Sequence, residues 1–326
     1  MSVTKEAYRQ LCREETSIPL FSQPWWLDAG AGSENWDVAL VEKGGRVLAT
    51  MPYLRRQRIG FCISTQPWLT LSLGPWLRPS TAKLPRRITQ QTELLQALLA
   101  QLPPFDHFCQ AWHYSQTNWL PFHWRGFRQT TGYSYVLPDL SDTHAIWNGF
   151  QEHLRKEIRK ASSRAQLCVR DDRPLQDVLR LHHLGSDRKH KGRVLLLPEA
   201  VIRSIDAACA QRGQRALFVA EDTKGRQHAA VYIVWDTNSA YYLLGGDDPR
   251  LRHSGALSLC LWEAIQHAAT VTRSFDFCGS MAEPIERFFR AFGGKQCPYF
   301  SVSKTPSKML AGYLFLASLR PEPQRL

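Results

Sequence analysis

Residues 241–265 read YYLLGGDDPRLRHSGALSLCLWEAI and contain the most informative change of pattern in the chain. An apolar strand ends at Gly245-Gly246, an Asp-Asp-Pro turn follows, and the small residues 254–256 then open an apolar helix. Unpaired backbone N–H groups and the positive end of the helix dipole meet at such a helix start, which suits it to bind an anion such as a pyrophosphate. The ordinary alternative is an N-terminal cap formed by Ser254.

The pattern around this stretch predicts an α/β (α+β) chain of two lobes. Apolar runs separated by turn residues predict an antiparallel meander over 215–247, a helix over 254–269 and a short helix near 284–292. The first part of the chain repeats this order loosely, with a hairpin at Lys43-Gly44-Gly45-Arg46 and a helix at 83–101. The turn-forming residues 138–142 predict the boundary between two lobes, 1–140 and 141–326. We expect each lobe to be a mixed, mainly antiparallel sheet flanked by helices.

Composition and charge indicate a globular protein that handles anions. Of the 326 residues, 44% are hydrophobic and 21% are charged, which excludes a disordered or fibrous chain. The formal net charge of +12 favours an acidic partner such as a nucleotide cofactor, RNA, a phosphorylated substrate or an anionic membrane surface. Composition does not choose among these partners.

The cysteines and the chain start suggest where the protein works. The eight cysteines are scattered with no CxxC pair, so we predict no zinc clip and no metal site. Scattered single thiols are typical of proteins in a reducing compartment. No uninterrupted apolar run approaches the ~18 residues that span a bilayer, and MSVTKEAYRQLCREE lacks the apolar run of a signal peptide. We therefore expect a cytoplasmic protein.

Several segments resemble those of the GNAT-like acyltransferases related to the FemAB peptidoglycan aminoacyltransferases and to CelD-type polysaccharide-biosynthesis proteins. They are PWWLDAG near the start, LRKEIRKA at 154–161, YYLLGGDDPRLRHSGALSL, FDFCGSM at 275–281, and RFFRAFGG with PYFSVSK. The resemblance implies two tandem GNAT-like lobes, with an acyl donor held in the second. It also implies acyl-CoA as donor substrate and no metal.

The donor site is expected at the start of the helix quoted above. The expected residues are Arg252, His253, Ser254, Gly255 and Ala256. Gly255 lets a phosphate approach the backbone, and Arg252 adds a charged donor. The motif Q/R-x-x-G-x-G/A of CoA-binding GNAT enzymes has Leu257 at its last small position here.

Acyl transfer to an amine requires a base and a donor for the developing oxyanion. Asp276 is our first catalytic candidate. A carboxylate inside the apolar strand FDF destabilises the fold unless it has a partner or a catalytic role. The alternative is that Asp276 accepts hydrogen bonds from the backbone amides of a neighbouring loop. Glu286 is the second candidate, with a solvated carboxylate as the alternative. We expect the backbone at the end of the YYLLGG strand to be the oxyanion donor, and Tyr242 and Gly245 to contact substrate.

A covalent mechanism is also conceivable, because Cys278 follows Asp276 closely and His253 is a candidate partner. The family resemblance favours direct attack. Arg155 and Arg159 lie four residues apart on one helix face, and we expect them to bind an anionic acceptor, either a small molecule or a lipid- or sugar-linked one. The alternative for these arginines is a solvated basic face.

Three functions stay open from the sequence. The first is an N-acyltransferase from acyl-CoA to an amine of an anionic acceptor, related to the cell envelope or to polysaccharides. The second keeps the fold but uses an aminoacyl-tRNA donor, consistent with the net charge and with Leu257. The third is a non-catalytic binding protein of polysaccharide biosynthesis. No DNA partner is expected.

The apolar run MLAGYLFLASL at 309–319 is too short to span a bilayer. We expect it to dock on the protein as a helix, with a role at a membrane surface as the alternative.

Overall fold

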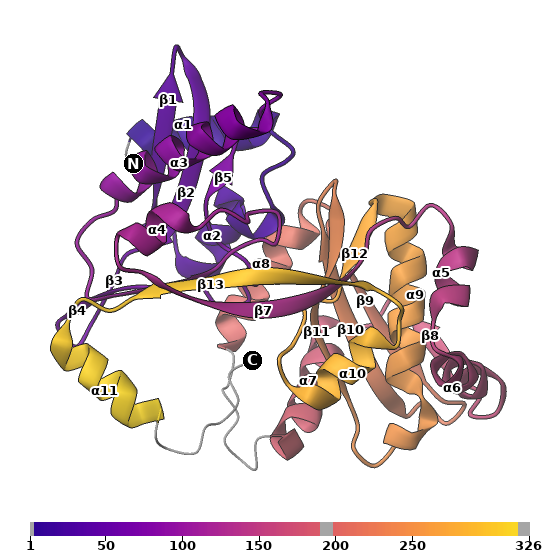
Figure 1. The fold of residues 1–326 in the computed structure, drawn as a ribbon. Coiled ribbons are helices and arrows are strands. Elements are labelled where there is room, and N and C mark those ends of the chain that lie inside the picture. The colour runs from indigo at the N-terminus through magenta and orange to yellow at the C-terminus, as the bar shows by residue number, and fades with distance from the viewer. Residues whose placement is uncertain (1–2, 190–197, 319–326) are drawn as a thin grey trace. The chain divides into compact units, whose positions relative to one another are not determined.

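The computed structural model of the chain describes residues 3–189 and 198–318 and divides them into two compact units (Figure 1). The first unit contains 3–132, 198–208 and 298–318, and the second contains 133–189 and 209–297. The sequence placed the boundary near 140 and assigned all later residues to the second lobe. The structure instead groups two later segments with the first unit, because their packing partners lie far away in the sequence.

The first unit joins short strands to helices. Its helices are α1 (Val3–Glu14), η1 (Leu20–Ser22), α2 (Pro24–Ala31), α3 (Leu84–Ala100), α4 (Leu120–Trp124), most of α8 (Glu199–Ala210) and α11 (Lys308–Ser318). Its strands are β1 (Trp36–Lys43), β2 (Arg46–Leu54), β3 (Arg56–Arg58), β4 (Phe61–Ser64), β5 (Trp76–Leu77) and β6 (His107–Ala111), with parts of β7 (Arg128–Leu137) and β13 (Lys295–Lys304).

Two sheets organise these elements. One sheet has the order β1-β2-β5, and β3-β4-β6-β13 are neighbours in the other. Lys43 pairs with Arg46 across the β1–β2 turn, which confirms the predicted hairpin. Buried aromatic side chains, including Phe108, Trp112 and Phe122, fill the space between α3, α4 and the strands.

The second unit contains six neighbouring strands of the larger sheet, with helices on both faces. Its helices are α5 (Thr143–Gly149), α6 (Glu152–Ser163), α7 (Leu175–Lys189), η2 (Arg252–Ser254), α9 (Ala256–Val271) and α10 (Glu283–Arg290). Its remaining strands are β8 (Cys168–Arg170), β9 (Arg215–Glu221), β10 (Gln227–Trp235), β11 (Ser239–Asp247) and β12 (Ser274–Asp276). The order is β7-β12-β11-β10-β9-β8, and only β11 and β12 run parallel. The predicted meander, its following helix and the mixed, mainly antiparallel α/β class are confirmed.

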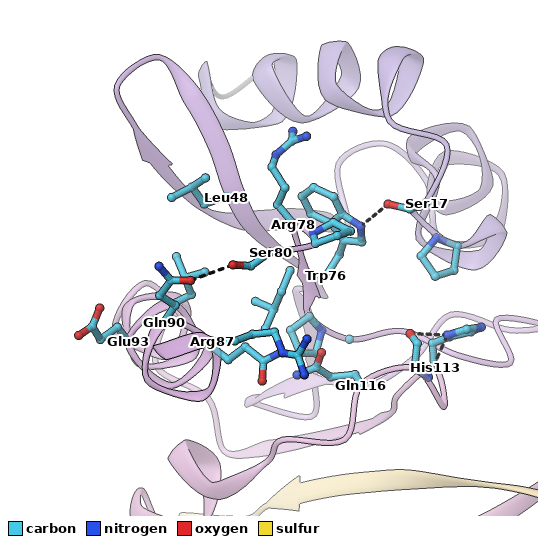
Figure 2. Close-up of a pocket in the computed structure, with 18 of the residues that line it drawn as sticks. Ser17, Leu48, Trp76, Arg78, Ser80, Arg87, Gln90, Glu93, His113 and Gln116 are labelled. Carbon is cyan, nitrogen blue, oxygen red and sulfur yellow. Dashed lines mark hydrogen bonds between the residues drawn. The ribbon is translucent and has the colours of Figure 1, made fainter. Parts of the chain in front are cut away.

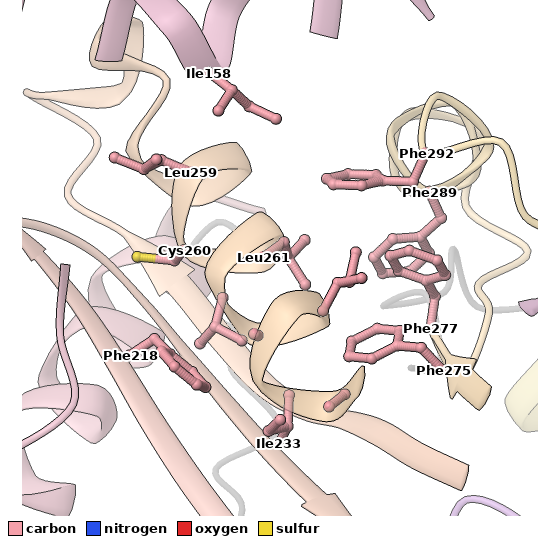
Figure 3. Packing of buried hydrophobic residues seen from close by; sticks show 14 of the residues in the cluster. Ile158, Phe218, Ile233, Leu259, Cys260, Leu261, Phe275, Phe277, Phe289 and Phe292 are labelled. Atoms are coloured by element: carbon pink, nitrogen blue, oxygen red, sulfur yellow. The ribbon is translucent and has the colours of Figure 1, made fainter. Parts of the chain in front are cut away.

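The core of this unit lies between α9 and the sheet. Small residues of α9, such as Ala264 and Ala268, are fully buried, so the helix axis lies close to β10 and β11. Four phenylalanines close the side of this core, as Figure 3 shows beside α9: Phe275, Phe277, Phe289 and Phe292. Aromatic pairs in edge and tilted geometry add specificity to this packing.

Helix α7 covers the opposite face of β11. A Cβ at Gly246 would lie 2.3 Å from the carbonyl oxygen of Leu181, so only glycine allows the helix to approach this closely. The Gly-Gly pair that ends the strand in the sequence is therefore explained in part by helix packing.

Replacing Leu261 by alanine is expected to reduce the free energy of unfolding by about 2–5 kcal/mol, because this α9 side chain is fully buried and its removal leaves a cavity. The matched control is Val271→Ala on the same helix, where the side chain is 39% exposed and the loss should be below about 0.5 kcal/mol. Urea unfolding followed by tryptophan fluorescence measures both. Equal losses would contradict this description of the core.

Candidate active site

Strands β11 and β12 pair over only three residues and then separate. Ser239 pairs with Ser274, Ala240 with Phe275, and Tyr241 with Asp276. Strand β11 continues to Asp247 along β10, whereas β12 ends at Asp276. The β11 backbone beyond Tyr241 therefore has a partner strand on one side only, and its other edge can receive a ligand.

A β-bulge lies just past this point of separation. Tyr232 of β10 pairs with Leu244 while the next residue, Ile233, pairs with Tyr242, so Leu243 has no register partner on β10. It has none on β12 either, because that pairing ends at Tyr241. A bulge re-aims the backbone and is common next to active sites. The sequence placed an oxyanion donor on this strand but not the bulge; the loss of two-residue alternation in Tyr-Tyr-Leu-Leu is the only local signal for it.

Asp276 lies at this separation and is 5% exposed. The Ser134 hydroxyl and the Cys278 backbone N–H, at 2.7 Å, both donate to its Oδ1. Burial raises the pKa of Asp276 to about 6, although these two hydrogen bonds favour the charged form. The carboxylate therefore caps a loop amide, as the alternative proposed, and it is also tuned close to neutral pH, which suits a general base.

Cys278 has the wrong properties for a nucleophile. Burial raises its pKa well above the ordinary value, and the neighbouring Asp276 carboxylate raises it further, so the thiol stays protonated at neutral pH. Its Sγ donates to the Asp276 carbonyl at 3.6 Å, and it also hydrogen bonds with the Tyr242 backbone. His253, its expected partner, is exposed on η2.

The two predicted catalytic carboxylates do not converge. Asp276 contacts Ser134, while Glu286 accepts a hydrogen bond from the Tyr135 hydroxyl. Ser134 and Tyr135 are consecutive on β7, and consecutive strand residues point to opposite faces of a sheet. Tyr135 belongs to the core on the α9 face, so Asp276 belongs to the other face.

Glu286 is held in a small polar network. Gln296 Nε2 donates to the Tyr135 hydroxyl at 2.9 Å, and Arg290 Nε lies 3.2 Å from Glu286 Oε1. The sequence could not place these groups, because the network joins residues more than a hundred positions apart.

The start of α9 is closed on one side by a carboxylate. Gly255 adopts a left-handed φ of 73°, as expected for a glycine-dependent turn. A Cβ there would lie 2.8 Å from Glu157 Cγ of α6, and Ser258 Oγ donates to Glu157 Oε1 at 3.2 Å. Glu157 therefore already supplies negative charge at the positive end of this helix. The sequence analysis missed Glu157, which comes from a distant helix.

The other residues expected to bind the donor lie around this turn. Arg252 Nε donates to Asp247 Oδ2 at 2.7 Å, so its charge is partly compensated. Ala256 is buried in the core. The Ser254 hydroxyl caps no amide and has no hydrogen-bond partner among the described residues, so its expected capping role is not seen.

Tyr242 and Gly245, expected to contact substrate, contact each other. A Cβ at Gly245 would lie 2.0 Å from the Tyr242 hydroxyl, so the glycine makes room for the ring. Burial raises the pKa of Tyr242, and the ring packs at 5.7 Å from Phe289. The ring therefore stays neutral and packs against the hydrophobic core of the second unit.

Arg155 and Arg159 lie on α6, with Arg159 exposed. Arg155 donates to the Asn148 carbonyl at 3.2 Å, and the Arg159 guanidinium lies 5.5 Å from the centre of the Trp147 ring. Both side chains therefore connect α6 with α5. Their outward charge is still available to an anion.

A cavity of about 1160 Å³ lies in the first unit, and none of the residues expected to be functional is among its lining residues (Figure 2). It is bounded by the β1–β2 turn, the segment 72–81, the start of α3 and the residues around His113. Figure 2 shows Arg78 beside Trp76, and Arg87 on α3 close to Gln116. The cationic lining residues are Lys43, Arg46, Arg78, Arg86 and Arg87.

The charge of this cavity is largely uncompensated. Arg78 is paired with Glu15 at 2.9 Å, but Lys43, Arg46, Arg86 and Arg87 form no ion pair with the described residues, and Glu93 is the only carboxylate in the lining. Burial lowers the pKa of His113 to about 4, so this residue is neutral at pH 7. The cavity therefore suits an anionic ligand.

Neither a metal site nor a membrane-spanning helix is found over 3–189 and 198–318. The described residues contain no group of three or more His, Cys, Asp and Glu side chains placed to hold a metal ion. Within the same ranges, every helix is too short or too polar to cross a bilayer.

Comparison with known proteins shows which proteins this chain is similar to. Residues 148–290 match the family described as the acetyltransferase (GNAT) domain. FemX has a similar structure, with a TM-score of 0.67, 12% identity, and coverage of 96% of this chain and 99% of FemX. No curated protein matches the chain by sequence.

Two further solved structures are similar. L-PGS from Bacillus licheniformis has a TM-score of 0.51 at 11% identity, covering 97% of each chain. A tandem GNAT protein from the clavulanic acid biosynthesis pathway, without AcCoA, has a TM-score of 0.50 at 11% identity, covering 92% of this chain and 94% of that one. At these identities the similarity shows the fold alone.

The raised pKa of Asp276 predicts a pH-dependent stability. Because its native pKa of about 6 exceeds the ordinary 3.8, the folded state binds more protons than the unfolded state between these values, and the free energy of unfolding falls as pH rises through them. Relative to Asp276→Asn, the protein should lose about 3 kcal/mol between about pH 4 and pH 7.

Urea unfolding of both proteins across that range measures the difference. A difference independent of pH, or one in which the unsubstituted protein gains stability as pH rises, would contradict a pKa of Asp276 that burial raises.

Proposed function

Because residues 148–290 match the acetyltransferase (GNAT) domain family and the chain has the fold of FemX, we propose that this protein is an N-acyltransferase that transfers an acyl group from acyl-CoA directly to an amine of an anionic acceptor. The observation that carries the proposal is the separation of β11 from β12 beside the bulge at Leu243, with Asp276 at the point of separation.

The unpaired edge of β11 is the proposed place for the reacting carbonyl. The donor, when bound, supplies a thioester carbonyl carbon. Leu243 has no register partner on either neighbouring strand, and its N–H is the proposed hydrogen-bond donor to the oxygen on which negative charge develops. A backbone donor in a bulge needs no reorganisation during the reaction.

Asp276 is the proposed general base. The attacking nitrogen must lose a proton, and a carboxylate with a pKa near 6 is largely ionised at neutral pH while still basic enough to accept that proton. The described residues donate only to Oδ1, which leaves Oδ2 for the amine. A carbon–nitrogen bond forms, the carbon–sulfur bond breaks, and the amine proton passes to Asp276.

We propose that the anionic part of the donor binds at the start of α9, on the side where Arg252 and His253 lie. Glu157 closes the α6 side of Gly255, so a pyrophosphate approaching there would meet a carboxylate. The exposed His253 and the partly exposed Arg252 are compatible with an anion on the remaining side.

The anionic nature of the acceptor is supported by two basic surfaces. The cavity of the first unit contains four arginine and lysine side chains without an ion-pair partner among the described residues. Helix α6 of the second unit adds Arg155 and Arg159. We propose that an acceptor carrying carboxylate or phosphate groups uses such a surface, and that its class is related to the cell envelope or to polysaccharides.

A second candidate keeps the site and changes the donor to an aminoacyl-tRNA. Two observations favour it: Leu257 replaces the last small residue of the CoA motif, and Glu157 occupies one side of the helix start where a pyrophosphate would lie. In this case the exposed cations of α6 would contact the tRNA backbone.

Replacing Leu243 by proline should lower kcat by about 10²–10³ with little change in KM, because proline lacks the N–H that is proposed to bind the oxyanion. Leu243→Ala is the matched control, since it removes the side chain and keeps the N–H. Release of the CoA thiol is measured with acetyl-CoA and a panel of amines that carry carboxylate or phosphate groups. Thermal unfolding checks that both variants fold. Equal activity of the two variants at equal stability argues against the assigned donor.

Calorimetry separates the two donors. With acetyl-CoA as titrant, the proposal predicts saturable binding at micromolar to low millimolar concentration. With an aminoacyl-tRNA as titrant, the second candidate predicts salt-sensitive binding that weakens in Arg155→Ala/Arg159→Ala. Binding of tRNA alone would replace the first proposal with the second, and binding of neither would contradict both.

A further inference from the structure

Helix α11 exposes apolar side chains where a docked helix would bury them. Met309, Tyr313, Phe315 and Leu316 are each between 63% and 72% exposed, and Leu310 is the buried contact. The expectation that this run docks along the protein is therefore wrong for most of its large side chains. Exposed apolar side chains gathered on one helix indicate an interaction surface.

A second exposed apolar residue lies at the tip of the β3–β4 hairpin. Ile59 is 89% exposed and has a φ of +51°, and Gly60 follows with a φ of +79°. Two consecutive positive φ values form the turn that favours Asn or Gly, and a β-branched residue is strained there. An isoleucine that is both strained and exposed suggests that its apolar side chain has a use outside the folded unit.

The hairpin tip and the start of α11 leave the same end of the first unit's sheet. Ser64 pairs with Phe108 on β6, and Phe108 pairs with Lys304 on β13. One residue further along, His107 Nδ1 lies 2.8 Å from Thr305 Oγ1. From these paired residues, β4 runs back toward Ile59 and β13 runs forward toward α11. Both segments therefore extend beyond the same end of the strands.

The charge of these two segments has one sign. Residues 55–63 contain Arg55, Arg56 and Arg58 and no acidic residue, and residues 298–318 contain Lys304 and Lys308 and no acidic residue. Basic side chains around exposed apolar ones match an anionic lipid surface, whose headgroups attract the cations while the apolar side chains enter the acyl boundary. A protein partner would need an equally acidic and apolar face.

We propose that this end of the first unit, formed by Ile59 with its flanking arginines and by the exposed face of α11, binds the surface of an anionic lipid bilayer. The proposal concerns attachment only, and it holds whichever acyl donor the second unit uses.

The full chain is tested by sedimentation with vesicles of phosphatidylglycerol and phosphatidylcholine, against vesicles of phosphatidylcholine alone. Partition into the anionic vesicles should exceed that into the neutral ones at least tenfold and should weaken as salt is added. Tyr313→Gln/Leu316→Gln should lower the partition at least tenfold, because these side chains are exposed and glutamine keeps a good helix propensity.

Ile59→Asn gives a sharper test. Asparagine suits the turn better than isoleucine, so this variant should be at least as stable as the original and yet bind vesicles less well. Val3→Gln is the control, since Val3 is 90% exposed on α1 and its replacement should leave the partition unchanged. Absence of binding to anionic vesicles, or unchanged binding in both test variants, would overturn the proposal. So would a dimer in analytical ultracentrifugation that the same substitutions dissociate.

Discussion

The burial of α9 on the sheet of the second unit is the constraint on which its functional geometry depends. Ala264 and Ala268 are completely buried, so the axis of the helix lies close to β10 and β11. This packing keeps β11 paired with β10 up to Asp247, while β12 leaves after Asp276. The free edge of β11 and the position of the buried carboxylate both follow from one strand being held while its neighbour departs.

The same constraint explains the turn before α9. Because the helix is fixed from Ala256 onward, the chain must enter through a left-handed residue, and only glycine fits beside Glu157. Sequence reasoning identified Gly255 and left two roles open for its small size, the approach of a phosphate and a tight entry into the helix. The structure shows that a protein carboxylate already uses part of that space, so the glycine has a packing role whatever ligand binds.

Much of the fold could be predicted, because its signals are local. Turn residues at 43–46 and the apolar period of α9 each lie within a few positions of the element that they define. The candidate site was harder. Asp276 was identified from its polarity in an apolar strand, but its separation from Glu286 depends on which face of β7 each contacts, and Ser134 and Tyr135 reveal this only once the strands are paired. The exposure of α11 likewise depends on tertiary packing, since its composition is typical of a buried helix.

Hydrogen–deuterium exchange with and without acetyl-CoA reports on the backbone of β11 itself, where we propose that the reacting carbonyl binds. Saturating acetyl-CoA should slow exchange in the peptide that spans residues 241–247, where Leu243 has no register partner, and in the peptide that spans η2 and the start of α9. Protection elsewhere in the chain, with none at 241–247, would contradict an acyl-transfer site at the separation of β11 and β12.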